Sequence, residues 1–168
     1  SQLGVLAFRG EETAAFLQGQ LTNDVQALHP DTAQWNAFCN PKGRLLGNFL
    51  MWRHGEDYCL QLSGDIAAPL LKRLSMYILR SKTRGRDASD ETVRLVVAGP
   101  AAADAVQAAL GLVPDAPMRT ASGDASVVVR VGADKFVLSL TPDRASTAWQ
   151  SLRTAATPVT RVPSMIRS

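Results

Sequence analysis

The residues best suited to bind a ligand lie in the segment CNPKGRLLGNFLMW, residues 39–52. Lys42 and Arg44 supply two cations that could pair with a carboxylate or a phosphate group. Gly43 between them would let a ligand approach the backbone closely. Pro41 and Gly43 also suit the second and fourth positions of an ordinary type I turn. The segment could therefore be a ligand cradle or the solvated tip of a hairpin.

Asn48 is a polar residue within an otherwise apolar strand pattern. In a strand over Leu45–Arg53 it would share one face with Leu46, Leu50 and Trp52. A polar side chain on an apolar face needs a hydrogen-bonding partner or lines a cavity. Gly47 beside it is typical of a bulge or of a ligand's close approach. Two interpretations stay open, a satisfied buried amide and a pocket-lining group.

A second polar cluster, Thr22-Asn23-Asp24, follows the apolar stripe of a predicted helix. Thr22 or Asn23 could cap a short turn after the helix stops. Alternatively, the amide of Asn23 and the carboxylate of Asp24 could hydrogen-bond the amino edge of a heterocycle.

Basic residues alternate through LRSKTRGR, residues 79–86, which places Arg80, Lys82, Arg84 and Arg86 on one side of an extended segment. This pattern is typical of a solvated linker. Contact with a nucleic-acid backbone is the alternative.

Composition and motifs exclude several classes of site. The net charge is only +3. A protein that coats duplex nucleic acid usually carries many more basic residues along one face. Neither a P-loop nor a GxGxxG fingerprint occurs, and no catalytic triad or metal-ligand spacing is visible, so we expect no metal. Cys39 and Cys59 are predicted to be reduced packing residues of a cytoplasmic protein. No apolar run is long enough to span a bilayer, so no membrane partner is expected.

An internal repeat predicts the architecture. Tyr58–Leu74 aligns without a gap on Phe136–Leu152, and Val5–Leu21 corresponds to Arg94–Leu110. Each copy reads as β-α-β-β-α, which indicates an α+β fold of ferredoxin-like antiparallel sheets with helices on one face. The first copy carries 11 extra residues, since Gly10 to Tyr58 spans 48 residues and Gly99 to Phe136 spans 37. The extra residues fall in 22–44, with an additional strand at WNAFC.

The repeat divides the chain into parts. We expect a first α+β unit over residues 1–86 that carries the ligand site, a linker over 87–92 and a second α+β unit over 93–156. Residues 157–168 would be a tail leading to a missing C-terminal part. A monomer is expected. Whether the two units exchange strands is left open.

Three segments together resemble a known family: FLQGQLTNDV, then CNPKGRLLGNFLMW, then LLKRLSMYILRSKTRGRD. They are similar to the YgfZ-type folate-binding proteins, relatives of the glycine-cleavage T-protein aminomethyltransferases. The resemblance runs over essentially the whole chain and is strongest over residues 16–86.

The resemblance implies a tetrahydrofolate-type cofactor, bound by residues of the polar segments above, Asn23, Asp24, Lys42, Gly43, Arg44 and Asn48. It also implies a role in iron–sulfur cluster assembly or repair and in tRNA modification, within one-carbon metabolism. Iron–sulfur assembly proteins and a transient tRNA contact would be the partners. Arg80, Lys82 and Arg84 are the candidate nucleic-acid contacts.

Two departures from the family bear on catalysis. T-proteins carry an Asp-Asp pair where this chain has Gly47-Asn48, which argues against aminomethyl transfer and leaves no catalytic residue to assign. The KGC-type motif of the YgfZ branch is absent, so an N-terminal portion is expected. A folate-dependent aminomethyltransferase and an RNA-contacting module stay open as alternatives.

Overall fold

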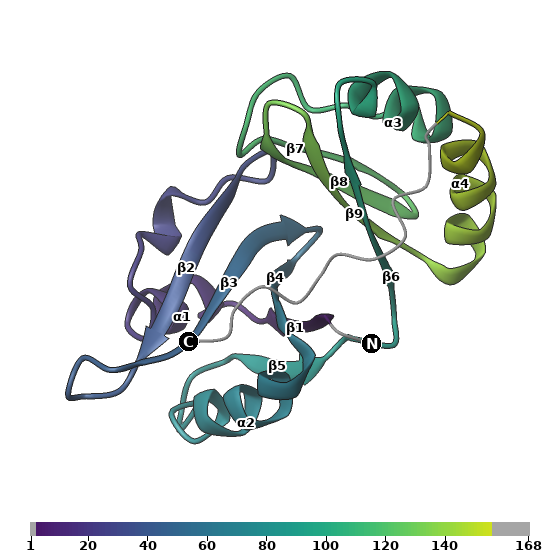
Figure 1. Ribbon diagram of the computed structural model, residues 1–168. Helices are drawn as coiled ribbons and strands as arrows, with labels where there is room; N and C mark the ends of the chain where they lie inside the picture. Colours follow the sequence, from purple (N-terminus) through teal and green to yellow (C-terminus); the bar gives the residue numbers. More distant parts are fainter. Residues whose placement is uncertain (1–2, 156–168) are drawn as a thin grey trace.

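The computed structural model describes residues 3–155, and two antiparallel sheets organise them (Figure 1). The first sheet has the order β2-β3-β4-β1-β5. Its elements are β1 (Leu3–Arg9), α1 (Thr13–Gln18), the short 3-10 helix η1 (Val25–Ala27), β2 (Ala33–Cys39), β3 (Leu45–His54), β4 (Asp57–Ser63), α2 (Gly64–Ser75) and β5 (Arg84–Asp87). The expected tail over 157–168 lies outside the described residues.

The second sheet has the order β6-β9-β8-β7. Its elements are β6 (Val93–Ala98), α3 (Ala102–Leu110), β7 (Thr120–Gly123), β8 (Ser126–Gly132), β9 (Lys135–Leu140) and α4 (Pro142–Ala155). The order β6-β9-β8-β7 reproduces β1-β4-β3-β2 of the first sheet, with α3 and α4 in the places of α1 and α2. The repeat and the α+β class predicted from the sequence are therefore confirmed.

Two details differ from the expectation. The extra strand at WNAFC, which is β2, has a short counterpart in β7, so the first copy differs by a longer loop, a longer hairpin and a longer turn rather than by an added strand. The polar stretch after residue 80 is not wholly a linker, because β5 forms there and pairs with β1 from Leu6↔Asp87 to Arg9↔Arg84. Pairing satisfies backbone groups that the edge of β1 would otherwise leave open.

With β5 in place, the first unit follows the β-α-β-β-α-β order of a ferredoxin-like motif through β1, α1, β3, β4, α2 and β5, and β2 is added at the edge. The two units form separate sheets in the described part of the chain.

Helices pack on the outer face of each sheet and the two inner faces pack on each other, so the fold has four layers, helices, sheet, sheet and helices. Phe8, Met51 and Leu60 pack under α1 and α2 on the outer face of the first sheet. An equivalent core lies beneath α3 and α4. The inner faces meet each other, where Trp52 shares a cluster with Val129. The two units are thus joined by an apolar core, not only by the chain between β5 and β6.

Gly10 ends β1 at a point where the backbone of the segment before β5 comes very close. Its φ is +140°, and a Cβ at this position would lie 1.9 Å from the carbonyl oxygen of Lys82. Only glycine combines this backbone conformation with this approach. The contact fixes where residues 81–83 cross the end of β1.

We expect Gly10→Ala to lower the free energy of unfolding by more than about 2 kcal/mol, because it adds backbone strain and forces Lys82 to move. Gly55→Ala is the matched control: Gly55 also has positive φ, +57°, but a Cβ there would meet nothing within 4 Å. Its cost should be about 1 kcal/mol, from the left-handed conformation alone. Urea unfolding measures both, and equal costs would contradict the role given to the Gly10 contact.

Candidate ligand-binding site

The turn between β2 and β3 is the type I turn that the sequence predicted. Gly43 N–H donates to the carbonyl of Asn40 (2.9 Å), and the Oδ1 atom of Asn40 accepts from the backbone N–H groups of Lys42 (3.0 Å) and Arg44 (2.9 Å). Gly43 has φ +75°, which closes the hairpin without strain. The side chains of Lys42 and Arg44 are exposed and make no hydrogen bond or ion pair within residues 3–155. The turn is ordinary, and its two cations are available to a ligand.

The side chains of Asn23 and Asp24 form hydrogen bonds that stabilise the turn in which they lie. Asp24 is the N-cap of η1, and its Oδ1 accepts from Gln26 N–H (3.0 Å). Asn23 Nδ2 donates to the carbonyl of Trp35 (3.1 Å), and its Oδ1 accepts from Asp24 N–H (2.8 Å). A capped short turn follows the helix, as predicted, but the predicted cap is wrong, because the cap is Asp24 and not Thr22 or Asn23. The second carboxylate oxygen of Asp24 is the group left to face solvent or a ligand.

Asn36 ties this turn to the sheet and was missed by the sequence reasoning. Its side chain is buried, and Oδ1 accepts from the backbone N–H groups of Thr22 (3.1 Å), Asn23 (2.9 Å) and Ala37 (3.0 Å). Thr22 N–H also donates to the carbonyl of Ala37 (3.1 Å). The turn therefore lies along the outer edge of β2. The signal in the sequence is a lone amide inside the apolar run WNAFC.

Asn48 lies on the inner face of the first sheet with Leu50 and Trp52, as predicted. The prediction is wrong for Leu46, which packs against the core of the outer face. Asn48 is opposite Ala37 on β2. Its side chain is exposed, so the interpretation as a buried amide is wrong. The reason is tertiary: the second sheet covers Trp52 and Leu50 but does not extend over Asn48.

Trp35 and Gln61 complete the open part of this inner face. Both are level with Leu50, since Trp35 pairs with it from β2 and Gln61 from β4. The Trp35 side chain is 55% exposed, which is unusual for a large aromatic residue in a sheet. Gln61 Oε1 is buried, with no hydrogen-bond partner among the described residues. An orphaned acceptor of this kind calls for a partner such as a water or a ligand.

Trp35, Asn48 and Gln61 lie on three adjacent strands, β2, β3 and β4. Asn48 and Gln61 are diagonal neighbours on adjacent strands, within reach of one planar molecule. Arg44 lies four residues before Asn48, which is roughly 13 Å in an extended strand, and Lys42 lies two residues further into the turn. The indole of Trp35 offers a stacking surface, the amides offer hydrogen bonds, and the cations offer charge for an anionic tail. This arrangement suits a flat heterocycle with a carboxylate extension.

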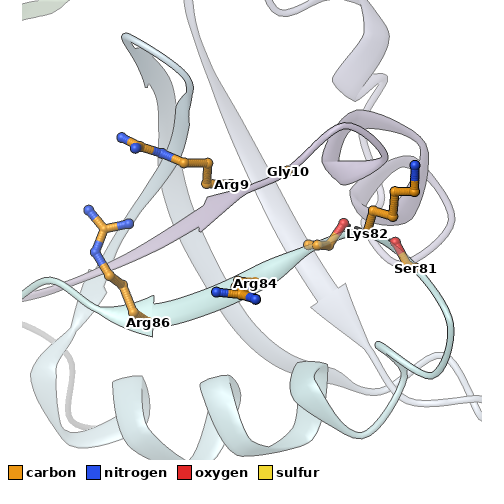
Figure 2. Close-up of a pocket in the computed structure, with 7 residues that line it drawn as sticks. Arg9, Gly10, Ser81, Lys82, Arg84 and Arg86 are labelled. Atoms are coloured by element: carbon orange, nitrogen blue, oxygen red, sulfur yellow. Dashed lines mark hydrogen bonds between the residues drawn. The ribbon is translucent and has the colours of Figure 1, made fainter.

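A second, basic groove lies at the other end of the sheet. Its volume is about 640 Å³, and it is lined by Arg9, Gly10, Ser81, Lys82, Thr83, Arg84 and Arg86 (Figure 2). Of the three predicted nucleic-acid contacts, Lys82 and Arg84 come together here, while Arg80 does not line the groove. Arg9 was missed, because only the pairing of β1 with β5 places it opposite Arg84.

Asp57 is the anionic anchor beneath this groove. Its side chain is 9% exposed and accepts from Arg9 Nε (2.8 Å) and from Arg86 Nη2 (2.8 Å). Burial would raise the pKa of Asp57, but the hydrogen bonds from Arg86 and Arg9 outweigh it, so the pKa lies below its ordinary value. The carboxylate therefore stays charged and fixes both guanidinium groups.

Cys39 and Cys59 are both free thiols. Burial raises the pKa of Cys59 to about 12, so this thiol stays protonated and unreactive. Within residues 3–155, no cluster of three or more His, Cys, Asp or Glu side chains could hold a metal ion. No helix in the described part is long and apolar enough to cross a membrane.

The family follows from a match that covers nearly the whole sequence. Residues 1–163 match the model of the GCVT N-terminal domain. The chain belongs to this family. The resemblance drawn from FLQGQLTNDV and CNPKGRLLGNFLMW is thereby confirmed.

Relatives in the GCVT N-terminal domain family carry two different names. The chain is 28% identical over 145 residues to a tRNA-modifying protein YgfZ from Pectobacterium carotovorum subsp. carotovorum (strain PC1), covering 85% of this chain and 43% of the relative. It is 31% identical over 166 residues to an aminomethyltransferase from Geobacillus kaustophilus (strain HTA426), covering 92% and 45%. The chain thus spans less than half the length of these relatives.

Solved structures share the fold. The aminomethyltransferase T of the glycine cleavage system from Bartonella henselae superposes with a TM-score of 0.79 at 20% identity, over 90% of this chain and 43% of that one. This likeness establishes a T-protein-like arrangement of the two sheets and four helices.

We expect Asn36→Ala to lower the free energy of unfolding by about 1 to 3 kcal/mol, because it removes the shared acceptor of three backbone N–H groups. Hydrogen exchange at the amides of Thr22 and Asn23 should accelerate together. Asn48→Ala removes an exposed amide of the same type and should change stability by less than about 0.5 kcal/mol. Unchanged exchange at Thr22 and Asn23 in Asn36→Ala would contradict the anchoring role.

Stability should also depend on the charge of Asp57. Because its folded pKa is depressed, its contribution is complete above the unfolded value of about 4 and is lost as the pH falls through the lower folded value. Urea unfolding from pH 6 to pH 3 should show a shallower loss of stability in Asp57→Asn than in the parent chain. Asp115→Asn, at an exposed carboxylate, is the control. Parallel pH profiles for the parent and Asp57→Asn would refute this assignment.

Proposed function

We propose that this chain is the tetrahydrofolate-binding part of a YgfZ-type accessory protein. The observation that carries the proposal is the open inner face of the first sheet, where an exposed indole, an exposed amide and an orphaned amide oxygen lie together. Trp35 would stack on the pterin ring, and Asn48 and Gln61 would hydrogen-bond its polar edge. Lys42 and Arg44 would pair with the glutamate tail.

The remaining predicted residues have supporting roles in this proposal. Gly43 keeps the turn tight enough to present both cations on one side. Asn23 holds the carbonyl of Trp35 and so positions the strand that carries the indole. Asp24 could accept from the ligand through its second carboxylate oxygen.

Names among the relatives support the wider role. A YgfZ relative is named a tRNA-modifying protein, so a transient tRNA contact through Arg80, Lys82 and Arg84 is part of the proposal. Participation in iron–sulfur cluster assembly, a cytoplasmic location and a monomeric state are also proposed, and these rest on the family resemblance alone.

A folate-dependent aminomethyltransferase is the second candidate, supported by the Geobacillus kaustophilus relative. The neutral amide of Asn48 argues against it. Asn48 cannot take up a proton as the carboxylate of a T-protein would at this place. Formation of methylenetetrahydrofolate from an aminomethylated carrier protein by the unmodified chain would favour this second candidate.

Calorimetric titration with tetrahydrofolate tests the proposed site. Trp35→Ala should weaken binding about tenfold or more, because stacking on an aromatic ring contributes about 1 to 3 kcal/mol. Trp149→Ala is the matched control, since Trp149 is 48% exposed on α4 of the second unit and should leave the affinity unchanged.

The cations provide an independent arm of the test. Lys42→Ala and Arg44→Ala should weaken a polyglutamylated folate more than the monoglutamate, because they are assigned to the tail. Equal affinity of the parent, Trp35→Ala, Asn48→Ala and Lys42→Ala would exclude the open inner face as the folate site.

A further inference from the structure

The basic groove gathers cations from two adjacent strands on one face. Arg9 on β1 is directly opposite Arg84 on β5, and Arg86 follows two residues later on the same face (Figure 2). Lys82 enters from the segment that precedes β5. The lining contains four cations and no carboxylate.

Two of these cations, Arg86 and Lys82, form ion pairs with neighbouring acids. Arg86 donates from Nη2 to Asp57 (2.8 Å) and from Nε to Glu91 (2.9 Å), and its Nη1 also reaches Asp57 (3.3 Å). Lys82 Nζ pairs with Glu11 at 2.8 Å. These contacts hold the walls of the groove in place.

Arg84 and Arg9 differ from them. The exposed guanidinium of Arg84 has no ion pair or hydrogen bond within residues 3–155. Arg9 donates Nε to Asp57, its Nη1 lies 3.8 Å from Glu56, and its Nη2 donates to no other described residue. Like charges directly opposite each other on neighbouring strands destabilise a sheet. The Arg9–Arg84 pair therefore lowers the stability of the fold. Both guanidinium groups also keep N–H donors that no described residue uses.

We propose that Arg9 and Arg84 bind a phosphate group. Two guanidinium groups on one face present planar sets of donors that match phosphate oxygens. Ser81, whose hydroxyl lines the same groove, adds a neutral donor. Asp57 orients Arg9 from below, so the site is partly preorganised before the anion arrives.

This proposal rests on the nucleic-acid contact proposed above and assigns it to a defined phosphate site. Arg9 takes the role that was given to Arg80, which does not line the groove. The phosphate belongs either to the backbone of an RNA strand or to a free phosphate compound. The site stands apart from the folate site, because Arg9 and Arg84 lie at the Gly55 end of the sheet and the turn cations lie at the opposite end. Tetrahydrofolate binding should be unchanged in all Arg84 variants, so the two proposals fail separately.

Fluorescence anisotropy with a labelled 12-nucleotide oligouridylate measures binding to the full chain at low salt. We expect Arg84→Gln to raise the Kd about tenfold, through loss of a charge-assisted contact. The slope of log affinity against log salt should become shallower by about 0.7, as for one lost phosphate contact on a single strand. Arg153→Gln, which makes the same charge change on an exposed residue of α4, should match the parent.

Competition with inorganic phosphate at constant ionic strength distinguishes the two sources. Displacement by millimolar phosphate, lost in Arg84→Gln, indicates a site for a free phosphate compound. Displacement only by unlabelled RNA indicates a backbone site. The proposal is overturned if neither the strand nor phosphate binds, or if Arg84→Gln and Arg153→Gln bind alike.

Arg84→Glu separates binding from folding. The new carboxylate would face Arg9 across the strand pair and remove the like-charge repulsion, so the Tm should rise while anion binding is lost. A variant that is more stable than the parent yet binds as tightly would also refute the assignment.

Discussion

Packing of Trp52 and Val5 against Val127 and Val129 joins the two sheets, and the extent of this shared core determines what a ligand can reach. Helices already cover the outer face of each sheet. The inner faces are therefore the only sheet surfaces left to bind anything in the described part of the chain. Because the second sheet covers Leu50 and Trp52 but stops before Asn48, one portion of the inner face stays open. The candidate folate site is a consequence of this incomplete overlap.

The inner face of the first sheet carries the core between the two sites, and its two ends differ in chemistry. Towards the turn after β2, the side chains are neutral amides and an indole, with cations only at the tip. Towards the turn after β3, Asp57 collects Arg9 and Arg86 around one buried carboxylate. A buried acid with two partly exposed guanidinium groups is a rigid scaffold rather than a source of much stability, since the cations stay in contact with water. The Asp57 carboxylate mainly fixes the positions of the Arg9 and Arg86 guanidinium groups.

The repeat could be predicted from the sequence because it depends on local patterns, the alternation of apolar residues in strands and their periodicity in helices. The same patterns occur in both aligned segments. The type I turn at Asn40–Gly43 was readable for the same reason, since its hydrogen bonds join residues close in the chain. Exposure of Asn48 was not readable, because it depends on how far the second sheet extends. The pairing of β5 with β1 could not be predicted either. It makes a strand of a polar stretch and places Arg9 opposite Arg84, two residues that are far apart in the sequence and that no local pattern connects.

The identity of the residue at position 48 matters more once its surroundings are known. An exposed carboxylate at this place, near solvent and the turn cations, would be charged and able to accept a proton from a bound amine. An amide there can donate and accept hydrogen bonds but cannot change its charge. Nearby, Gln61 contributes another neutral amide, and the thiol of Cys59 is held protonated by burial. On the open inner face, Trp35 therefore offers a stacking surface, and Asn48 and Gln61 offer hydrogen bonds. These three side chains can recognise a heterocycle without any change in their own charge.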